Sequence, residues 1–218
     1  MAPDPAPANR PISRRKRRAI TLAAALAVSC ALPLPAAPAS AEPVTRDGLT
    51  FSDELGGFRI LSLSGIGSLE DPFVLVEEMT TLGEIALVIR GLASRSQLRP
   101  NRFSSITFAG FHLVKVVINR SGREWASYEH ELREDLAEPS SYGDGLSFDQ
   151  PKTGPRPFES DRFQRSHEVT EPADLVRFDS GRVAVGEAAT FRYVITDASP
   201  LDRFYLLQRP AWPIAARR

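Results

Sequence analysis

Three histidines, His112, His130 and His167, have the widest range of chemistry in this sequence. Imidazole binds zinc and exchanges protons near neutral pH, so three of them together would define a metal site. A hairpin that we expect around residues 121–122 places Glu131 opposite His112. Because Glu131 neighbours His130 on its strand, His112 and His130 then point to opposite faces of the sheet. The sequence therefore predicts no histidine metal site.

Carboxylate pairs are the second kind of candidate, because a glycoside hydrolase needs two carboxyl groups facing one cleft. Glu77 and Glu78 are neighbours on an expected strand, so their side chains point to opposite faces of the sheet. Glu129 and Glu131 do share a face, and we interpret them as part of a solvated sheet surface. Neither pair predicts a catalytic centre.

Two loops contain residues typical of ligand sites. The segment 144–149, Asp-Gly-Leu-Ser-Phe-Asp, spaces oxygen atoms as calcium loops do, but it lacks their Asp-x-Asp opening and their final glutamate. The glycines of segment 65–67 resemble a dinucleotide loop, but Glu70 occupies the third glycine position and no helix pattern follows. Both segments predict turns. We therefore expect no catalytic, cofactor-binding or metal-binding residues in this chain.

Short strands must position these residues, because alternating segments are separated by frequent glycine, proline and aspartate. From Ala188 to Thr196, for example, aromatic and aliphatic residues alternate with mostly polar ones, which is the period of a half-buried strand. The segment Phe111–Asn119 is apolar on both faces, which predicts a central strand. The expected strands are Phe58–Ser64, Phe73–Thr80, Glu84–Leu92, Ser104–Ala109, Phe111–Asn119, Glu124–Arg133, Leu175–Phe178, Arg182–Val185, Ala188–Thr196 and Arg203–Gln208.

The expected hairpin turns at residues 121–122, where Gly122 supplies the positive φ of a tight turn. If residues 120 and 123 face each other, Trp125 lies opposite Ile118 and belongs to the core. A helix over residues 125–136 is the alternative, because the apolar residues there also fit helical spacing.

A long proline- and glycine-rich excursion occupies about residues 138–172. Loops of this length in compact domains are functional or disordered. Phe148, Phe158 and Phe163 are spaced along it, so we expect them to pin the excursion to the body of the domain as an ordered cover.

The segment Gly181–Asp197, with a Gly-Glu turn before an alternating strand, resembles the strand–turn–strand unit of bacterial immunoglobulin-like domains. The resemblance covers under a tenth of the chain and implies a fold, not a function. Together with the strand pattern, it predicts an all-β fold, an immunoglobulin-like or related two-sheet antiparallel β-sandwich. We expect residues 42–218 to form this single domain.

The first 41 residues have the three parts of a bacterial secretory signal peptide. A basic cluster at 14–18 precedes an apolar segment at 19–31 and a small-x-small site that ends at Ala41. We expect residues 1–41 to be removed by cleavage after Ala41. Cys30 ends an apolar run that resembles a lipoprotein processing box, so a lipid anchor at Cys30 is the alternative.

The charge of the remaining domain excludes some classes of partner. The chain has 27 basic and 27 acidic residues, and the leader holds six of the former and one of the latter, which leaves about −5. Nucleic acids and anionic membrane surfaces attract basic proteins, so we expect neither as a partner. The apolar runs after residue 41 are only strand-length, so we expect no membrane span.

These observations predict a periplasmic or secreted, non-catalytic binding or scaffold module of the bacterial cell envelope. Its expected partner is an envelope protein or an envelope glycan. The alternative is a secreted, glycan-directed hydrolase whose carboxylates come together from different strands. That alternative requires one deep pocket in which Asp144, Asp149, Glu159 and Asp161 meet Trp125 or Tyr128. A flat apolar patch would instead favour protein binding.

Overall fold

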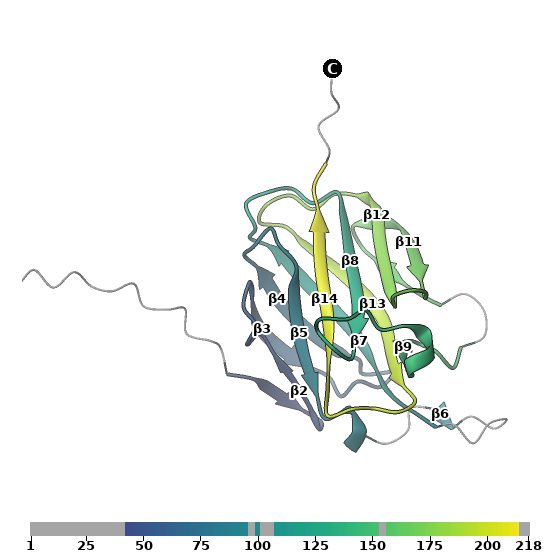
Figure 1. The fold of residues 1–218 in the computed structure, drawn as a ribbon. Helices are drawn as coiled ribbons and strands as arrows, with labels where there is room; N and C mark the ends of the chain where they lie inside the picture. Colours follow the sequence, from purple (N-terminus) through teal and green to yellow (C-terminus); the bar gives the residue numbers. More distant parts are fainter. Residues whose placement is uncertain (1–41, 96–98, 101–106, 153–155, 214–218) are drawn as a thin grey trace, which may run out of the picture. The chain divides into compact units, whose positions relative to one another are not determined.

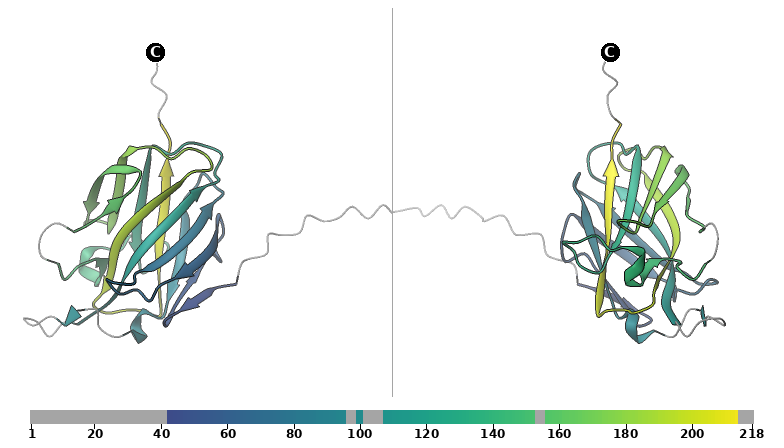
Figure 2. Two further views of the ribbon diagram at one scale, coloured as in Figure 1. Left: turned by 180° about the vertical axis from the view of Figure 1, so that it is seen from behind. Right: turned by 45° about the vertical axis from the view of Figure 1, so that its right-hand side comes forward.

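The computed structural model describes residues 42–95, 99–100, 107–152 and 156–213. They form two β-sheets that pack against each other around a shared apolar core, which confirms the predicted β-sandwich (Figure 1). Seen from behind, the teal and green strands of one sheet run obliquely across the yellow strand of the other (Figure 2). The expected signal peptide 1–41, with Cys30 and the cleavage position after Ala41, lies outside the described residues.

The first sheet, sheet A, has seven strands in the order β1-β2-β5-β14-β8-β12-β11, and each neighbouring pair is antiparallel. Its strands are β1 (Val44–Arg46), β2 (Leu49–Ser52), β5 (Ile85–Arg90), β14 (Arg203–Ala211), β8 (Ser127–Arg133), β12 (Leu175–Gly181) and β11 (Phe163–Val169). β14 lies at its centre.

The second sheet, sheet B, has the order β10-β13-β7-β4-β3, with β9 also beside β13 and β6 beside β7. Its strands are β10 (Glu159–Ser160), β13 (Ala188–Asp197), β7 (Thr107–Asn119), β4 (Phe73–Met79), β3 (Phe58–Ser64), β9 (Leu146–Phe148) and β6 (Arg99–Pro100). β4 and β7 run parallel, so the sheet is mixed, whereas the sequence predicted antiparallel pairing. A parallel pair needs a crossover connection, and β5 in sheet A lies between these two strands in the sequence.

The core lies between the sheets and contains two groups of aromatic side chains. At one end, Phe51, Phe73 and Phe111 pack edge to face, with ring centroids 5.5 to 6.1 Å apart. At the other end, Trp125 and Tyr128 of the β8 region pack with rings from β12 and β13. Both groups pack rings from sheet A against rings from sheet B, the first edge to face and the second tilted.

The predicted central position of β7 is confirmed, since β7 lies between β13 and β4. Its pairing with β13 covers ten residue pairs, from Ala188 beside Ile118 to Asp197 beside Ala109. β7 is one strand where the sequence predicted two, Ser104–Ala109 and Phe111–Asn119, and residues 101–106 lie outside the described residues.

The predicted hairpin at residues 121–122 is wrong. β7 pairs with strands of sheet B, whereas β8 pairs with β12 and β14 of sheet A, so the turn carries the chain from one sheet to the other. The buried Asn119 side chain holds this crossing, because its amide donates to the carbonyl oxygens of Arg123 and Val183 at 2.7 and 3.0 Å. Gly122 has a φ of 82°, as the turn chemistry predicted.

Trp125 is fully buried, as predicted, but its backbone pairs with Val183 and not with Ile118. Its indole N–H donates to the hydroxyl of Ser121 at 3.0 Å. Because β8 is a strand, the alternative of a helix over residues 125–136 is also wrong.

In the part of the chain that the structure describes, no helix is long and apolar enough to cross a bilayer.

The excursion at 138–172 is ordered where it is described, and it contains β9, β10, β11 and the 3-10 turn η2 (Tyr142–Asp144). Phe148 and Phe163 are buried and Phe158 packs against the core, so the aromatic residues do pin it. β9 is the short strand that was expected after the turn at 144–145, whereas β10 and β11 are absent from the sequence prediction, as are β1, β2, β6 and the 3-10 turn η1 (Leu92–Ser94). The predicted strand 182–185 is not formed. Only Val183 pairs there, in an isolated β-bridge with Trp125.

Candidate functional site

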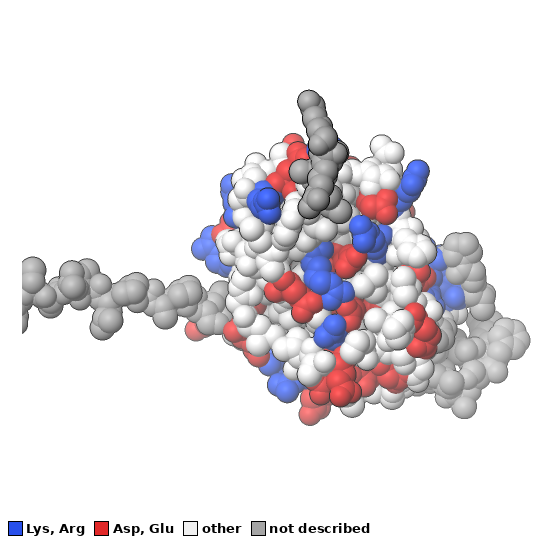
Figure 3. Space-filling model, turned by 45° about the horizontal axis from the view of Figure 1, so that its top comes forward, with Lys and Arg blue, Asp and Glu red and all other residues white. Residues whose placement is uncertain are grey.

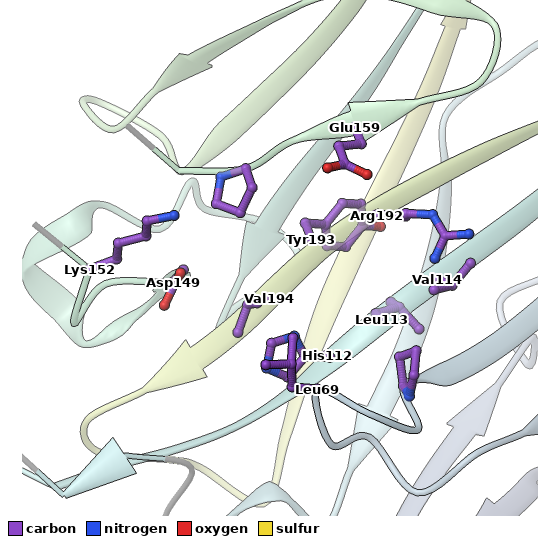
Figure 4. A pocket seen from close by; sticks show the side chains of 12 residues that line it. Leu69, His112, Leu113, Val114, Asp149, Lys152, Glu159, Arg192, Tyr193 and Val194 are labelled. Carbon is purple, nitrogen blue, oxygen red and sulfur yellow. The ribbon is translucent and has the colours of Figure 1, made fainter. Parts of the chain in front are cut away.

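A groove of about 330 Å³ opens on the outer face of sheet B, where Asp149 and Lys152 after β9 and Pro157 and Glu159 near β10 border it (Figure 4). Val114 of β7 and Val194 of β13 contribute to its apolar floor. The polar side chains along it are His112, Asp149, Lys152, Glu159 and Arg192. The groove therefore combines an apolar base with charges of both signs.

The register of β7 and β13 sets the pattern of the floor. Val194 lies beside His112, and Arg192 lies beside Val114, so each valine is next to a polar side chain. Lys152 projects over one end of the groove and Arg192 over the other, and Glu159 stands above Tyr193 of β13 (Figure 4). A ligand lying along this floor would meet polar groups at both ends.

Beyond the groove, the outer face of sheet B continues as an apolar surface that we call the valine face. It consists of Val74 and Val76 on β4 and Val114, Val116 and Ile118 on β7. Val74 lies beside Val114, and Val76 lies beside Val116. Four of these residues are partly exposed, and the fifth, Val114, is buried at the groove. The solvent face of a sheet normally carries polar side chains, so an apolar row on two central strands is unusual.

Leu69 stands where the groove meets the valine face, and it is 69% exposed. The turn before β4 holds it there. The backbone N–H groups of residues 66, 67 and 68 all donate to the carbonyl oxygen of Asp71, at 2.9 to 3.2 Å. Gly65 and Gly67 have φ values of 78° and 79°. The segment 65–67 is thus a turn, as predicted, and it presents an apolar side chain to solvent.

β9 and its neighbours hold the cover of the groove in place. β9 pairs antiparallel with the end of β13, and the ring of Phe148 packs edge to face on Tyr193 and Phe158 at 5.3 and 5.6 Å. The chain then turns at Asp149, whose φ is 44°, and the backbone N–H of Gln150 donates to the hydroxyl of Thr196 at 3.0 Å. These contacts position Asp149 beside the groove.

Four carboxylates, Glu134, Asp144, Asp174 and Asp197, interact at the base of the excursion. Burial raises the pKa of Asp174 to about 7 against the opposing hydrogen bond from Ser147, and the charge of Asp144 adds to the rise. Burial also raises the pKa of Glu134 and of Asp197, again with a contribution from Asp144. Within the described ranges, no three His, Cys, Asp or Glu residues are arranged to hold a metal ion.

The three histidines lie in different environments. His112 lines the groove and pairs with Val194, not with Glu131 of β8 as the predicted hairpin required. His130 is fully buried between the sheets, where burial and the charge of Lys115 hold its pKa well below the usual range. His167 is exposed on the edge strand β11. The structure thus separates His112 from His130, although the predicted register was wrong.

The carboxylates of the hydrolase alternative do not meet the aromatic side chains that it required. Asp149 and Glu159 line the groove, whereas Asp161 accepts two hydrogen bonds from the start of β13, at 2.7 and 3.0 Å. Asp144 belongs to the acidic cluster, and the segment 144–149 is a turn leading into β9, as predicted. Trp125 and Tyr128, the aromatic residues in question, are both in the core and line no part of the groove.

The outer face of sheet A carries charges that neutralise one another. Arg209 contacts Glu84 at 2.6 Å and Glu129 at 3.2 Å, and it also contacts Glu131. Arg133 contacts Glu131 at 2.6 Å. Acidic and basic side chains are interspersed over the centre of the surface shown in Figure 3. Glu129 and Glu131 share one sheet face, as predicted, but the predicted solvated position is wrong for Glu131, which is only 3% exposed because Arg133 and Arg209 contact it.

An ion pair that was not predicted from the sequence joins Glu77 of β4 to Lys115 of β7 inside the core. Both side chains are fully buried. A signal was present in the sequence, because Lys115 interrupts the apolar run of β7 and Glu77 directly follows four apolar residues of β4. Glu78 points to the opposite face of the sheet from Glu77, as predicted, and contacts Arg59 at 2.7 Å.

The fold and the site together define a two-sheet β-sandwich with a partly covered apolar outer face. Comparison with protein-family models, with curated proteins and with solved structures finds no match to this chain. Its function is therefore inferred from its own side chains.

Proposed function

We propose that this chain is a non-catalytic binding module of the bacterial cell envelope, and that it binds a partner protein through the valine face and the adjoining groove. The observation that carries the proposal is the row of partly exposed apolar side chains on β4 and β7. Burying this surface against another protein removes apolar area from water, which is the main favourable term in protein association. A flat apolar face suits a protein better than a glycan, whose hydroxyl groups need hydrogen-bond partners.

The groove supports the same proposal. Its valine floor is bordered by Arg192 and Lys152 and by the carboxylates of Asp149 and Glu159. Such a lining provides apolar contact for side chains and polar contact for the backbone or charged residues of an extended peptide segment. The groove would then fix the orientation of a partner that the valine face attracts.

The proposed location is the periplasm or the cell exterior, and it rests on the tripartite leader at 1–41. N-terminal analysis of the protein isolated from its own cells is expected to find Glu42 as the first residue. A diacylglyceryl group on Cys30 would instead place the protein on a membrane surface.

The binding proposal is tested by capture from envelope extract with three baits, which are the wild type, Val116→Lys and Val185→Lys. Val116 lies on the valine face, whereas Val185 is 53% exposed and lines neither the groove nor that face. We expect the wild type and Val185→Lys to retain the same partner protein and Val116→Lys to lose it. Circular dichroism shows whether each bait is folded. Equal capture by all three folded baits would contradict the proposal.

A further inference from the structure

Lys115 and Glu77 lie on the inner faces of neighbouring parallel strands. Lys115 is directly beside Leu75, and Glu77 is beside Val117, so the two charged residues are diagonal neighbours across β4 and β7. Long side chains reach across this diagonal. The lysine side chain follows β4, and its Nζ contacts Oε1 of Glu77. Both side chains are 0% exposed.

In the part of the chain that the structure describes, this pair has no further hydrogen-bond partner. Among the described residues, Lys115 Nζ has no hydrogen-bond acceptor besides the Glu77 carboxylate, and that carboxylate has no donor besides Nζ. Lys115 lies beside Phe191, and His130 packs on Phe191 and on Tyr193 with ring centroids 4.8 and 5.2 Å away. The ring nitrogens of His130 and the hydroxyl of Tyr193 also have no hydrogen-bond partner among the described residues.

This environment disfavours the charged form of the pair. An ion pair taken out of water is compensated only when further hydrogen bonds satisfy its remaining protons and lone pairs. Burial lowers the pKa of the Lys115 ammonium group, although Glu77 opposes the change. A neutral amine beside a carboxyl group is the combination from which an amide forms, and the fold holds the two groups in contact.

We propose that Lys115 and Glu77 are joined by an intramolecular amide bond that forms in the folded chain. One proton first passes from the ammonium group to the carboxylate, which leaves an amine beside a carboxylic acid. Lys115 Nζ then attacks Glu77 Cδ, so that the Nζ–Cδ bond forms and the bond from Cδ to the hydroxyl oxygen breaks. The hydroxyl leaves as water with one proton of the amine. Nothing is oxidised or reduced, and no co-reactant is consumed.

The product replaces two buried charged groups by one neutral amide and ties β4 covalently to β7. These strands make the parallel pair at the centre of sheet B, directly beneath the valine face. The chain from residue 42 onward contains no cysteine. The amide would therefore give an exported domain a covalent cross-link that no reductant breaks.

The test is mass spectrometry of the denatured protein after its N-terminus has been determined. The wild type is expected to be lighter than its sequence mass by one water molecule. An N-terminal glutamate can also lose water by cyclisation, so peptide mapping must locate the loss in a branched peptide that contains both Glu77 and Lys115. The full sequence mass, or recovery of the two residues in separate linear peptides, would overturn the proposal.

Two variants separate this chemistry from a structural ion pair. Lys115→Arg keeps the positive charge, but its guanidinium group does not form the amide, so this variant is expected to have its full sequence mass. Glu77→Gln is expected to condense with loss of ammonia and to give the same product and the same mass as the cross-linked wild type. Loss of one water from Lys115→Arg that does not map to its N-terminus would refute the assignment of Lys115. The wild-type measurement needs no variant to fold.

Discussion

Replacing Asp174 by asparagine is expected to stabilise the protein at neutral pH. The carboxyl group is fully buried, Oδ1 accepts a hydrogen bond from Ser147 at 3.1 Å, and Oδ2 has no hydrogen-bond partner among the described residues. Its pKa rises from 3.8 to about 7 on folding, chiefly because of burial. Between these values the folded state binds a proton that the unfolded state has released, so the contribution of Asp174 to stability falls as the pH rises.

The size of the effect follows from the same values. Ionising Asp174 in both states opposes folding by about 4 kcal/mol if the whole pKa rise is expressed as stability. Asparagine removes the charge but leaves a buried polar group. We therefore expect Asp174→Asn to raise the free energy of unfolding at about pH 8 by half of this value, roughly 2 kcal/mol. At about pH 4 the gain should be near zero, because the carboxyl group is then largely protonated in the folded state.

Urea unfolding followed by circular dichroism measures this difference at several pH values, and equal m-values make the midpoints comparable. Asp202→Asn, at an exposed position, is the matched control and should show no such trend. A gain for Asp174→Asn that is the same at all pH values, or a loss of stability at about pH 8, would refute the reasoning.

Trp125→Ala should lower the free energy of unfolding by roughly 3–5 kcal/mol in the same assay, because it empties a buried site, and Trp212→Ala, at an exposed site, should cost far less. Gly122→Val should lower the free energy of unfolding by about 1 kcal/mol, because valine is strained at a φ of 82°, although a Cβ atom at this position meets no other atom. Gly65→Ala should destabilise the protein more than Gly122→Val, because its Cβ would lie 1.9 Å from the backbone oxygen of Pro72. Equal losses of stability in the two variants would contradict this. Thermal unfolding should be unchanged by EDTA and by reductant, and a midpoint lowered by EDTA would show a bound metal.

Much of the strand pattern could be predicted from the sequence, because alternation is a local property. The segment Phe58–Ser64 coincides with β3, and the alternation over Ala188–Thr196 predicted all but the last residue of β13. The turn at 121–122 was predicted too, but its chemistry is the same whether the next strand joins the same sheet or the opposite one. The hydrogen bond from Asn119 to Val183, which fixes the crossing, joins residues 64 positions apart.

The candidate site was harder to predict. The apolar character of β7 on both faces predicted a central strand, but a sequence does not show whether the outer face of that strand is covered. The short strands β9 and β10 carry little periodic signal, so the cover of the groove was expected only from the spacing of its aromatic residues. Lys115 and Glu77 were visible as charged residues in largely apolar strands, but their contact depends on the parallel register of β4 and β7.

The valine face is the central feature of the proposed function, and photo-cross-linking in the cells that make the protein tests it most directly. A photoreactive residue is placed at Val76, on the valine face, and in a second variant at Leu201, which is 50% exposed and lines no part of the groove. We predict a covalent adduct with one partner protein from Val76 and none from Leu201. No adduct from Val76, or an adduct from Leu201 alone, would contradict the account.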